Sequence, residues 1–278
     1  MDNKKSEWTL IIKSNSKNHI MSDLWMFRDL FLALCKRDFN VRYKQTVLGI
    51  LWAVIRPILI MLVFTIIFGN LANLPTDGAA PYAIMVYAAT LPWQFFSTAL
   101  ETSSASLVGN SQLVSKVYFP RIIIPVSSML VGVIDFLISF FVLLILMVYY
   151  DFYPDIKILF IPFFLLLSFL TALGIGLYIT ALNVRYRDFR YVIPFIIQFG
   201  LYISPVGFSS SIIPDEYQLI YNLNPMVGVI DGFRWCILGN ESSFNLDGLL
   251  MSLFVMVFFL YLGFTTFKKM EHTFNDVI

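Results

Sequence analysis

Three charged side chains stand alone inside long apolar runs of the sequence: Arg56, Glu101 and Asp135. An ionised group surrounded by hydrocarbon is costly, so each of them should face other protein groups or water. Their charges alone make Arg56 and Glu101 candidates for an ion pair. At helical spacing, Glu101 forms a polar stripe with Gln94, Ser97 and Ser104. Such a stripe fits either packing between helices or the wall of a water-filled path.

Aromatic and amide side chains occur at helical spacing in a later run. The residues that this spacing places on one side of a helix are Tyr191, Phe195, Gln198 and Tyr202. Trp52 and Arg56 likewise lie on one side of a helix in an earlier apolar run. Aromatic rings and scattered amides suit the C–H faces and hydroxyls of a sugar chain, so these residues are candidates for a substrate path. Tyr and Trp also mark bilayer interfaces or pack between helices, which is the second interpretation.

Residues that could catalyse a reaction or bind a metal are scattered. The sequence has no G-x-x-x-x-G-K-[ST] loop, so the chain should not bind ATP by itself. His19 and His272 lie in polar terminal stretches, and no nucleophile stands beside a base. Cys35 and Cys236 are too few for a disulfide framework. We expect no catalytic residue, metal or cofactor in this chain.

The composition excludes a soluble globular domain. Hydrophobic residues make up 58% of the 278 residues and charged residues only 13%, about half the ~25% of soluble domains. A helix of about 20 apolar residues crosses a bilayer. The apolar runs predict an all-α membrane protein with six transmembrane helices: Val47–Leu71, Pro81–Leu107, Ile122–Tyr150, Ile156–Val184, Tyr191–Gly207 and Leu246–Phe267.

Lysine and arginine determine the predicted orientation of these spans. With both termini in the cytoplasm, nearly all of the 19 basic residues flank the spans on the cytoplasmic side. Only Lys157 and Arg234 lie outside, and Arg56 lies within a span. An excess of lysine and arginine is expected in the cytoplasmic loops of a membrane protein. The sequence has no basic domain that would indicate nucleic-acid binding. The predicted boundaries are a cytosolic tail 1–22, a membrane domain 46–270 and a cytosolic tail 271–278.

Residues 23–45 predict a helix that lies along the membrane surface. Apolar side chains gather on one side of this helix, and charged or amide side chains gather on the other. The apolar side comprises Leu24, Phe27, Leu30, Phe31, Leu34 and Val41, and the polar side comprises Asp29, Lys36, Arg37, Asn40 and Lys44. A cationic face opposite Trp, Phe and Leu side chains is typical of an amphipathic helix in a membrane interface.

Between the fifth and sixth spans, residues 208–240 are the least regular part of the chain. They contain turn residues and a short apolar helix, which is about 22 Å long at a rise of ~1.5 Å per residue and cannot cross a bilayer. A seventh span here would move the C-terminal lysines outside. We expect a re-entrant or interfacial hairpin on the outer side, with an outer gate formed by Asn224, Pro225, Met226, Asp231 and Arg234.

The loop between the second and third spans, residues 106–121, is a short amphipathic segment that ends at Pro120. Such a segment can dock into a groove of a cytosolic partner. Composition alone favours a charged loop at the membrane edge instead. The side chains that would contact a partner are Gln112, Lys116, Tyr118, Phe119 and Arg121.

Four stretches resemble type-2 ABC exporter permeases for polysaccharides. Arg42–Trp52, followed by Arg56 and a proline, is similar to the entry of their first span, and Leu113–Pro125 is similar to their coupling region. Asn183–Asp188 resembles the motif at the end of their fourth span, and Asn224–Met226 resembles their outer hairpin. The closest likeness is to O-antigen (Wzm-type) permeases. Arg56 departs from the pattern, because a neutral polar residue is expected there.

The resemblance implies the permease subunit of an exporter that moves undecaprenyl-diphosphate-linked polysaccharide across the bacterial inner membrane. It implies two copies of this chain and two copies of a separate cytosolic ATPase, which holds the ATP and Mg²⁺. The ATPase would contact the 106–121 loop together with Arg185, Arg187 and Asp188. Charge alone, and not the resemblance, makes Arg56 a candidate to meet the diphosphate of such a substrate or to pair with Glu101.

Other functions remain open at this point. Capsule or teichoic-acid export is the nearest alternative, because those permeases are close relatives of the O-antigen permeases. A membrane transferase acting on a polyprenyl lipid is more remote, since it should offer a carboxylate pair or a His/Asp cluster at a membrane face. A passive scaffold would not need charges inside its spans.

Overall fold

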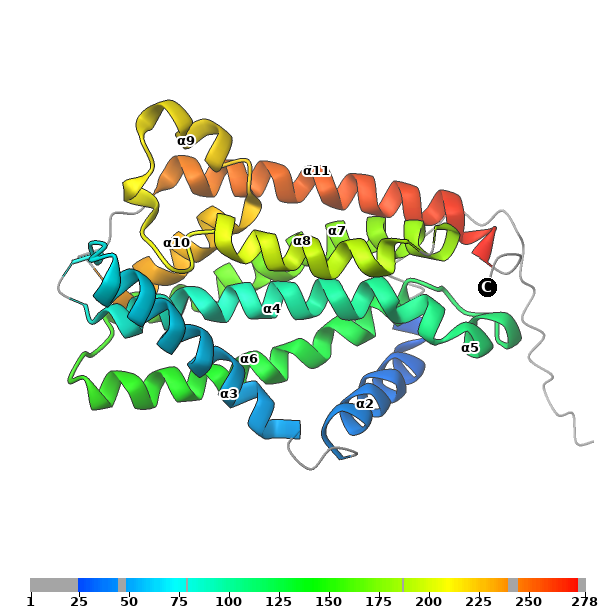
Figure 1. Cartoon of the computed structure of the whole chain (residues 1–278). Coiled ribbons are helices and arrows are strands. Elements are labelled where there is room, and N and C mark those ends of the chain that lie inside the picture. The colour runs from blue at the N-terminus through cyan, green and yellow to red at the C-terminus, as the bar shows by residue number, and fades with distance from the viewer. Residues whose placement is uncertain (1–24, 45–48, 79, 187, 240–244, 275–278) are drawn as a thin grey trace, which may run out of the picture.

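The structure is a computed structural model that describes residues 25–44, 49–78, 80–186, 188–239 and 245–274. Within these ranges every regular element is a helix (Figure 1), which confirms the all-α prediction. The predicted tail 1–22 and Arg187 lie outside the described residues, as does part of the tail 271–278.

The described helices follow one another in this order: α2 (Arg28–Lys44), α3 (Gly49–Phe64) continuing into the π-helical η1 (Thr65–Leu71), α4 (Tyr82–Gly109), α5 (Ser111–Lys116), α6 (Ile123–Tyr149), the 3-10 turn η2 (Ile156–Phe160), α7 (Ile161–Arg185), α8 (Phe189–Ile203), η3 (Ser210–Ile212), α9 (Asp215–Tyr221), α10 (Pro225–Leu238) and α11 (Leu246–Glu271). The α2 and α5 helices and the C-terminal end of α11 lie toward one end of the bundle, and α9 lies at the other (Figure 1).

Helices that are long and apolar enough to cross a membrane coincide with the first, third, fourth and sixth predicted spans. They are Gly49–Leu71, Ile123–Tyr149, Ile156–Arg185 and Leu246–Glu271. The fifth predicted span is the shorter apolar helix α8, which ends at Ile203 because Ser204 is extended and Pro205 follows. The second, α4, is long but carries the polar stripe around Glu101. The count of six spans therefore stays a prediction.

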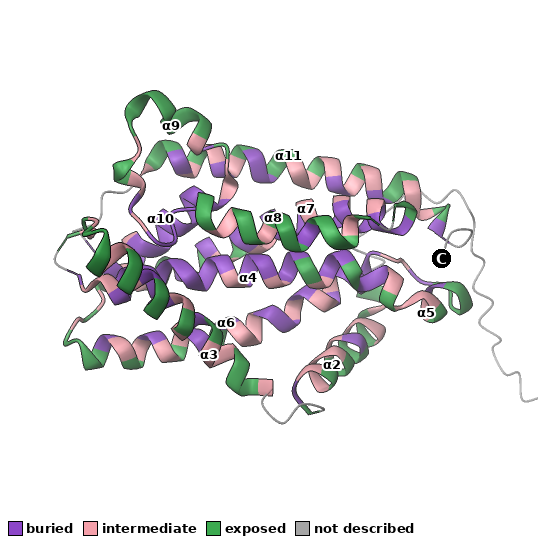
Figure 2. Cartoon of the chain, in the orientation of Figure 1, coloured by how far each residue is buried: buried purple, intermediate pink, exposed green. Residues whose placement is uncertain are grey.

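The α4 helix forms the centre of the bundle. Most of its residues are buried (Figure 2), and it packs mainly against α6 and α7. Small residues allow this close approach: a Cβ added at Gly176 of α7 would lie 2.5 Å from Oγ of Ser103 in α4. Because other helices surround α4, it does not need a continuous apolar surface, which explains its polar residues.

The α7 and α11 helices are in backbone contact. A Cβ at Gly174 would lie 2.6 Å from the backbone nitrogen of Leu260, and one at Gly263 would lie 2.2 Å from the carbonyl oxygen of Gly174. Small residues at such a crossing let two helices pack closely inside a membrane. This contact fixes α11 against the rest of the bundle.

The α2 helix lies against α6. Leu34 of the predicted apolar side is buried, and Phe27, Leu30 and Phe31 pack against the same core. The thiol of Cys35 approaches the carbonyl oxygen of Ser127 at 3.8 Å. Val41, also predicted on the apolar side, is exposed in this single chain, where lipid can cover it, and Leu24 lies outside the described residues. Tyr43, which the prediction assigned to neither side, is buried.

Candidate functional site

A cavity of about 210 Å³ lies between α3, α4 and α6 and extends to the C-terminal end of α2. Its polar lining comes from residues that are far apart in sequence: Arg42, Trp52, Arg56, Gln94 and Asp135. The structure therefore brings Trp52 and Arg56 of the predicted path together with Asp135, one of the predicted intramembrane acids. Phe95 and Phe136 supply apolar walls.

Asp135 is held by two groups from the end of α2. Arg42 forms an ion pair with one carboxylate oxygen, and the hydroxyl of Tyr43 donates a hydrogen bond to the other. Burial raises the pKa of Tyr43 above its usual value, and the hydrogen bond to Asp135 adds to this shift. A lone acid in an apolar run signals that a cation must lie nearby, but only the packing of α2 on α6 reveals that this cation is Arg42.

A second cavity, of about 270 Å³, lies between α3, α4 and α8 and shares Arg56 and Gln94 with the first. Glu101 and Gln198 also line it. Arg56 forms no ion pair with any residue that the structure describes, so the predicted pairing with Glu101 is not made. The amide nitrogen of Gln94 is buried and has no hydrogen-bond partner in the described chain.

The aromatic face predicted on α8 lies at the surface of the chain (Figure 2). Tyr191 is 78% exposed, and Phe195 and Tyr202 are also exposed. Of the four predicted path residues on α8, Gln198 lines the second cavity. The ring of Tyr202 lies 6.1 Å from that of Phe64, beside the end of α3. This face is available to lipid or to another chain.

A groove of about 510 Å³ lies between α2 and α5, toward the end of the bundle where α11 ends. Arg37, Gln112 and Lys116 line it, and Lys116 and Tyr118 are exposed. Phe119 was predicted to contact a partner too, but its side chain is buried in the protein core. Two cations and an amide at an open groove suit an acidic or polar protein surface.

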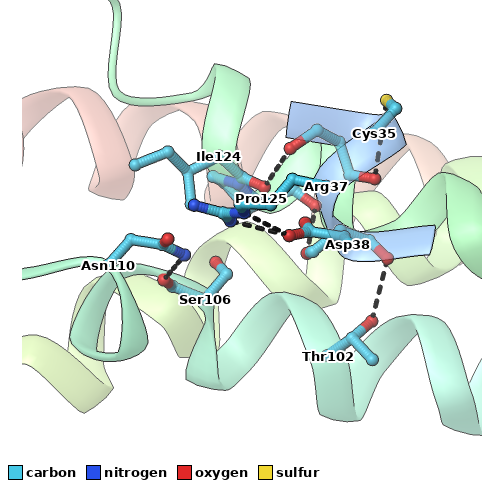
Figure 3. Close-up of polar contacts among 10 residues, drawn as sticks. Cys35, Arg37, Asp38, Thr102, Ser106, Asn110, Ile124 and Pro125 are labelled. Atoms are coloured by element: carbon cyan, nitrogen blue, oxygen red, sulfur yellow. Dashed lines mark hydrogen bonds and ion pairs between the residues drawn. The ribbon is translucent and has the colours of Figure 1, made fainter. Parts of the chain in front are cut away.

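Local hydrogen bonds shape this groove (Figure 3). Arg37 lies beside Asp38 on α2, with 2.6 Å between Nη2 and Oδ1, and the amide of Asn110 donates to the carbonyl oxygen of Ser106 at 2.8 Å. The second contact caps the end of α4 where α5 begins. The groove therefore lies between the middle of α2 and the junction of α4 with α5.

The loop 106–121 is also attached to the end of α11. The backbone nitrogen of Arg121 donates to Oε1 of Glu271 at 3.1 Å, and its guanidinium donates to the carbonyl oxygen of Glu271 at 2.5 Å. Of the remaining predicted coupling residues, Arg185 and Asp188 are exposed at the start of the α7–α8 connection. Asn183 beside them is structural, because its amide donates to the carbonyl oxygen of Ser104 at 2.8 Å.

The opposite end of the bundle contains a buried arginine. Arg234 of α10 is 1% exposed and donates to the carbonyl oxygens of Phe208 at 2.8 Å and Val206 at 3.3 Å. Asp77, from the turn after the first span, lies 3.6 Å from Nη1 of Arg234 and accepts a hydrogen bond from Ser209. We call these five residues the Arg234 cluster. It joins three segments that are distant in sequence.

The α10 helix is more deeply enclosed than an interfacial hairpin would be. All its residues except Pro225 and Trp235 are buried, because α4, α7 and α11 surround it. Asn224 caps it, accepting from the backbone nitrogen of Met226 at 3.0 Å and donating to Oγ of Ser204 at 2.9 Å. The preceding α9, in contrast, lies on the surface (Figure 2).

Asp231 is buried one helical turn before Arg234. Burial raises the pKa of its carboxyl group to about 6, although the positive charge of Arg234 acts in the opposite direction. One of its carboxylate oxygens, Oδ2, has no hydrogen-bond partner in the described chain. Both residues were named in the predicted outer gate, but Asp77 was not identified as a partner.

Comparison with known proteins places the sequence in a family. Residues 29–238 match the family described as ABC-2 type transporter. The chain is 25% identical to an O-antigen export system permease protein RfbA of Klebsiella pneumoniae, over 90% of this chain and 95% of the relative. It is 27% identical to the protein of the same name from Myxococcus xanthus, over 77% and 82% of the two chains. The chain therefore belongs to the ABC-2 type transporter family.

Proposed function

We propose that this chain is the permease subunit of an ATP-driven exporter for a polysaccharide of the O-antigen type, carried on undecaprenyl diphosphate. The observation that carries the proposal is the similarity to O-antigen export permeases over almost the whole chain. The two cavities that share Arg56 and Gln94 support it, because they combine a cation, amides and aromatic rings within the helix bundle. Such groups can contact sugars and phosphate without holding one sugar tightly.

ATP hydrolysis would take place on a separate cytosolic ATPase, since the sequence has no phosphate-binding loop. In this proposal the ATPase docks on the groove between α2 and α5 and on the α7–α8 connection. Both termini then lie in the cytoplasm, and the membrane is the bacterial inner membrane. The distribution of lysine and arginine supports this orientation.

The transported chain would move between two copies of this permease. The exposed faces of α3 and α8 support this arrangement, because each carries large aromatic residues such as Trp52 and Tyr191 at the surface of one copy. Lipid could also cover these faces. Two ATPase copies would drive the two permease copies, and α10 with the Arg234 cluster would close the outer end between transport steps.

Capsule or teichoic-acid export is the alternative substrate assignment. The genes beside the coding sequence would separate the two. An ATPase gene whose product has an extra C-terminal sugar-binding domain favours a capped O-antigen, whereas teichoic-acid synthesis genes favour the alternative.

Crosslinking would test the proposed docking site. In a chain whose Cys35 and Cys236 are replaced by serine, a cysteine is placed at Gln112 or Lys116, both of which line the groove. The variant is labelled with a short reagent that carries a maleimide for the thiol and a photoreactive group, co-purified with its ATPase and illuminated. We expect crosslinks from both positions and none from a cysteine at Leu219, which is exposed on α9 at the opposite end. If neither groove position crosslinks in any nucleotide state, the proposed docking site is wrong.

Export itself is tested in a strain that lacks the gene. The full-length chain should restore polysaccharide at the cell surface, detected with a glycan-specific antibody. Accumulation of glycan inside the cell in its absence is the expected defect. Normal surface glycan in the deletion strain would contradict the proposed function.

A further inference from the structure

We propose that Arg56 and Gln94 form a binding site for the phosphate headgroup of a membrane-embedded lipid, in the cavity between α3, α4 and α6. Nothing in the family match or in the names of the relatives assigns this site. It would give the proposed exporter a contact to the charged part of its substrate, and to that extent it rests on the proposed function.

The first argument is the balance of charge in this cavity. Arg42, Arg56 and Asp135 line it. Asp135 is the partner of Arg42, so that pair contributes no net charge. Arg56 remains with its full positive charge, since it forms no ion pair within the described chain. The neighbouring cavity adds Glu101, whose carboxylate does not come within ion-pair distance of Arg56.

The second argument is the position of Arg56. It lies seven residues after Gly49, the first residue of α3, which corresponds to about 10 Å of helix. Arg56 is exposed at the surface of the single chain, inside a helix that is long and apolar enough to cross a membrane. An arginine within such a helix is rare because its charge is costly in hydrocarbon, and it marks a pathway or a bound counter-ion when it occurs. An anionic headgroup would provide the missing counter-charge.

The third argument is the unsatisfied amide of Gln94. Its nitrogen is buried without a hydrogen-bond partner in the described residues, although Gln94 lines both cavities. Native proteins leave few buried donors unpaired, because each one loses its bonds to water. An acceptor in the cavity would satisfy this N–H group. A guanidinium and an amide donor together recognise phosphate oxygens.

The cavity has room for such a group. Its volume of about 210 Å³ is far above the ~10–15 Å³ that one water molecule needs. Trp52 lies one helical turn before Arg56 and lines the same space, so an apolar chain attached to the phosphate would meet an aromatic ring. The diphosphate of a polyprenyl carrier and the phosphate of a bilayer phospholipid share this chemistry.

Binding is measured on the full-length chain purified in detergent. The probes are farnesyl diphosphate, farnesol and dihexanoyl phosphatidylglycerol, titrated by calorimetry. The variants are Arg56→Gln, Arg56→Lys, Gln94→Leu and the control Lys269→Gln. Lys269 is an exposed cation near the end of α11 and lies outside the cavities. Unfolding temperatures confirm that each variant is folded, and Arg56→Lys keeps the charge if Arg56→Gln does not fold.

We expect wild type and Lys269→Gln to bind farnesyl diphosphate at least tenfold more tightly than farnesol. Arg56→Gln should remove most of this difference, Arg56→Lys should retain part of it, and Gln94→Leu should weaken binding about fivefold. If Arg56→Gln weakens the binding of phosphatidylglycerol as well, the cavity is a general site for lipid phosphates. If it weakens the binding of farnesyl diphosphate alone, the cavity is a site for the carrier lipid.

Unchanged binding in Arg56→Gln and Gln94→Leu, or equal affinity of wild type for farnesol and its diphosphate, would overturn the proposal. The readout involves no transport. Intact phosphate binding combined with normal surface glycan in the deletion strain would therefore reject the proposed function and leave the site standing.

Discussion

Replacement of Arg234 by methionine should destabilise the protein strongly. The side chain is 1% exposed and donates to the carbonyl oxygens of Val206 and Phe208. Methionine fills similar space but leaves both carbonyls unpaired and removes the cation closest to Asp77 and Asp231. Breaking a buried ion pair by removing one partner costs about 3–5 kcal/mol of unfolding free energy.

The expected loss lies near the lower end of this range. The pKa of Asp231 is already raised to about 6. Without Arg234 it should rise further, so the carboxyl group can take up a proton at neutral pH instead of remaining as an unpaired buried charge. We therefore expect a loss of about 3 kcal/mol for Arg234→Met at pH 7. Asp77→Asn should cost only about 1–2 kcal/mol, because Arg234 keeps both carbonyl acceptors.

The assay is unfolding of the purified chain in one detergent, with the two single variants and the double variant measured side by side. The double variant should lose less than the sum of the single variants, because Arg234 and Asp77 interact directly. Asp215→Asn on the exposed α9 helix is the control and should change stability by less than about 0.5 kcal/mol. If Arg234→Met also stays within about 0.5 kcal/mol of wild type, this explanation of the cluster is wrong.

Three further predictions concern packing, the position of α2 and pH. Gly174→Val should lower the free energy of unfolding by about 1–3 kcal/mol or more, because the added carbons meet the backbone of α11. Gly109→Ala should not destabilise the protein, because nothing lies within 4 Å of the added Cβ. Unfolding temperatures of the two variants test this difference. Asp135→Asn should detach the end of α2 from α6, because it breaks the ion pair with Arg42. Trypsin should then cleave faster after the basic residues of α2. An unchanged cleavage rate would show that Asp135 does not hold α2 in place. The free energy of unfolding should fall by up to about 3 kcal/mol between pH 4 and pH 7. The reason is that burial raises the pKa of Asp231, so the folded state keeps a proton that the unfolded state releases at lower pH. This dependence of stability on pH should disappear in Asp231→Asn.

Hydropathy and charge spacing were sufficient to predict the long apolar helices, but not the short surface helix α9. The ends of α6 and α11 lie within a few residues of the predicted spans, because a long apolar run can satisfy its backbone in a membrane only as a helix. The lone charges Arg56, Glu101 and Asp135 were also identified as positions that need a protein or aqueous environment. These properties are local in sequence, so they can be found without a fold.

The side of a helix that packs against its neighbours was harder to predict. Val41, on the predicted apolar side of α2, is exposed in this chain while Tyr43 is buried, and Phe119 is buried although Tyr118 beside it is exposed. Hydrophobicity does not distinguish contact with lipid from contact with protein. Only the packed neighbours decide between them.

Composition and the spacing of apolar and basic residues thus determined on their own that the chain is helical and built for a membrane. The tertiary structure alone decided which groups meet: Tyr43 with Asp135, 92 residues away, Arg234 with Asp77, and Arg56 with Gln94 around one cavity. The physical reason is that an isolated charge requires a partner, but any of several distant side chains could supply it. The partner is selected by the crossing of helices, which no local pattern encodes.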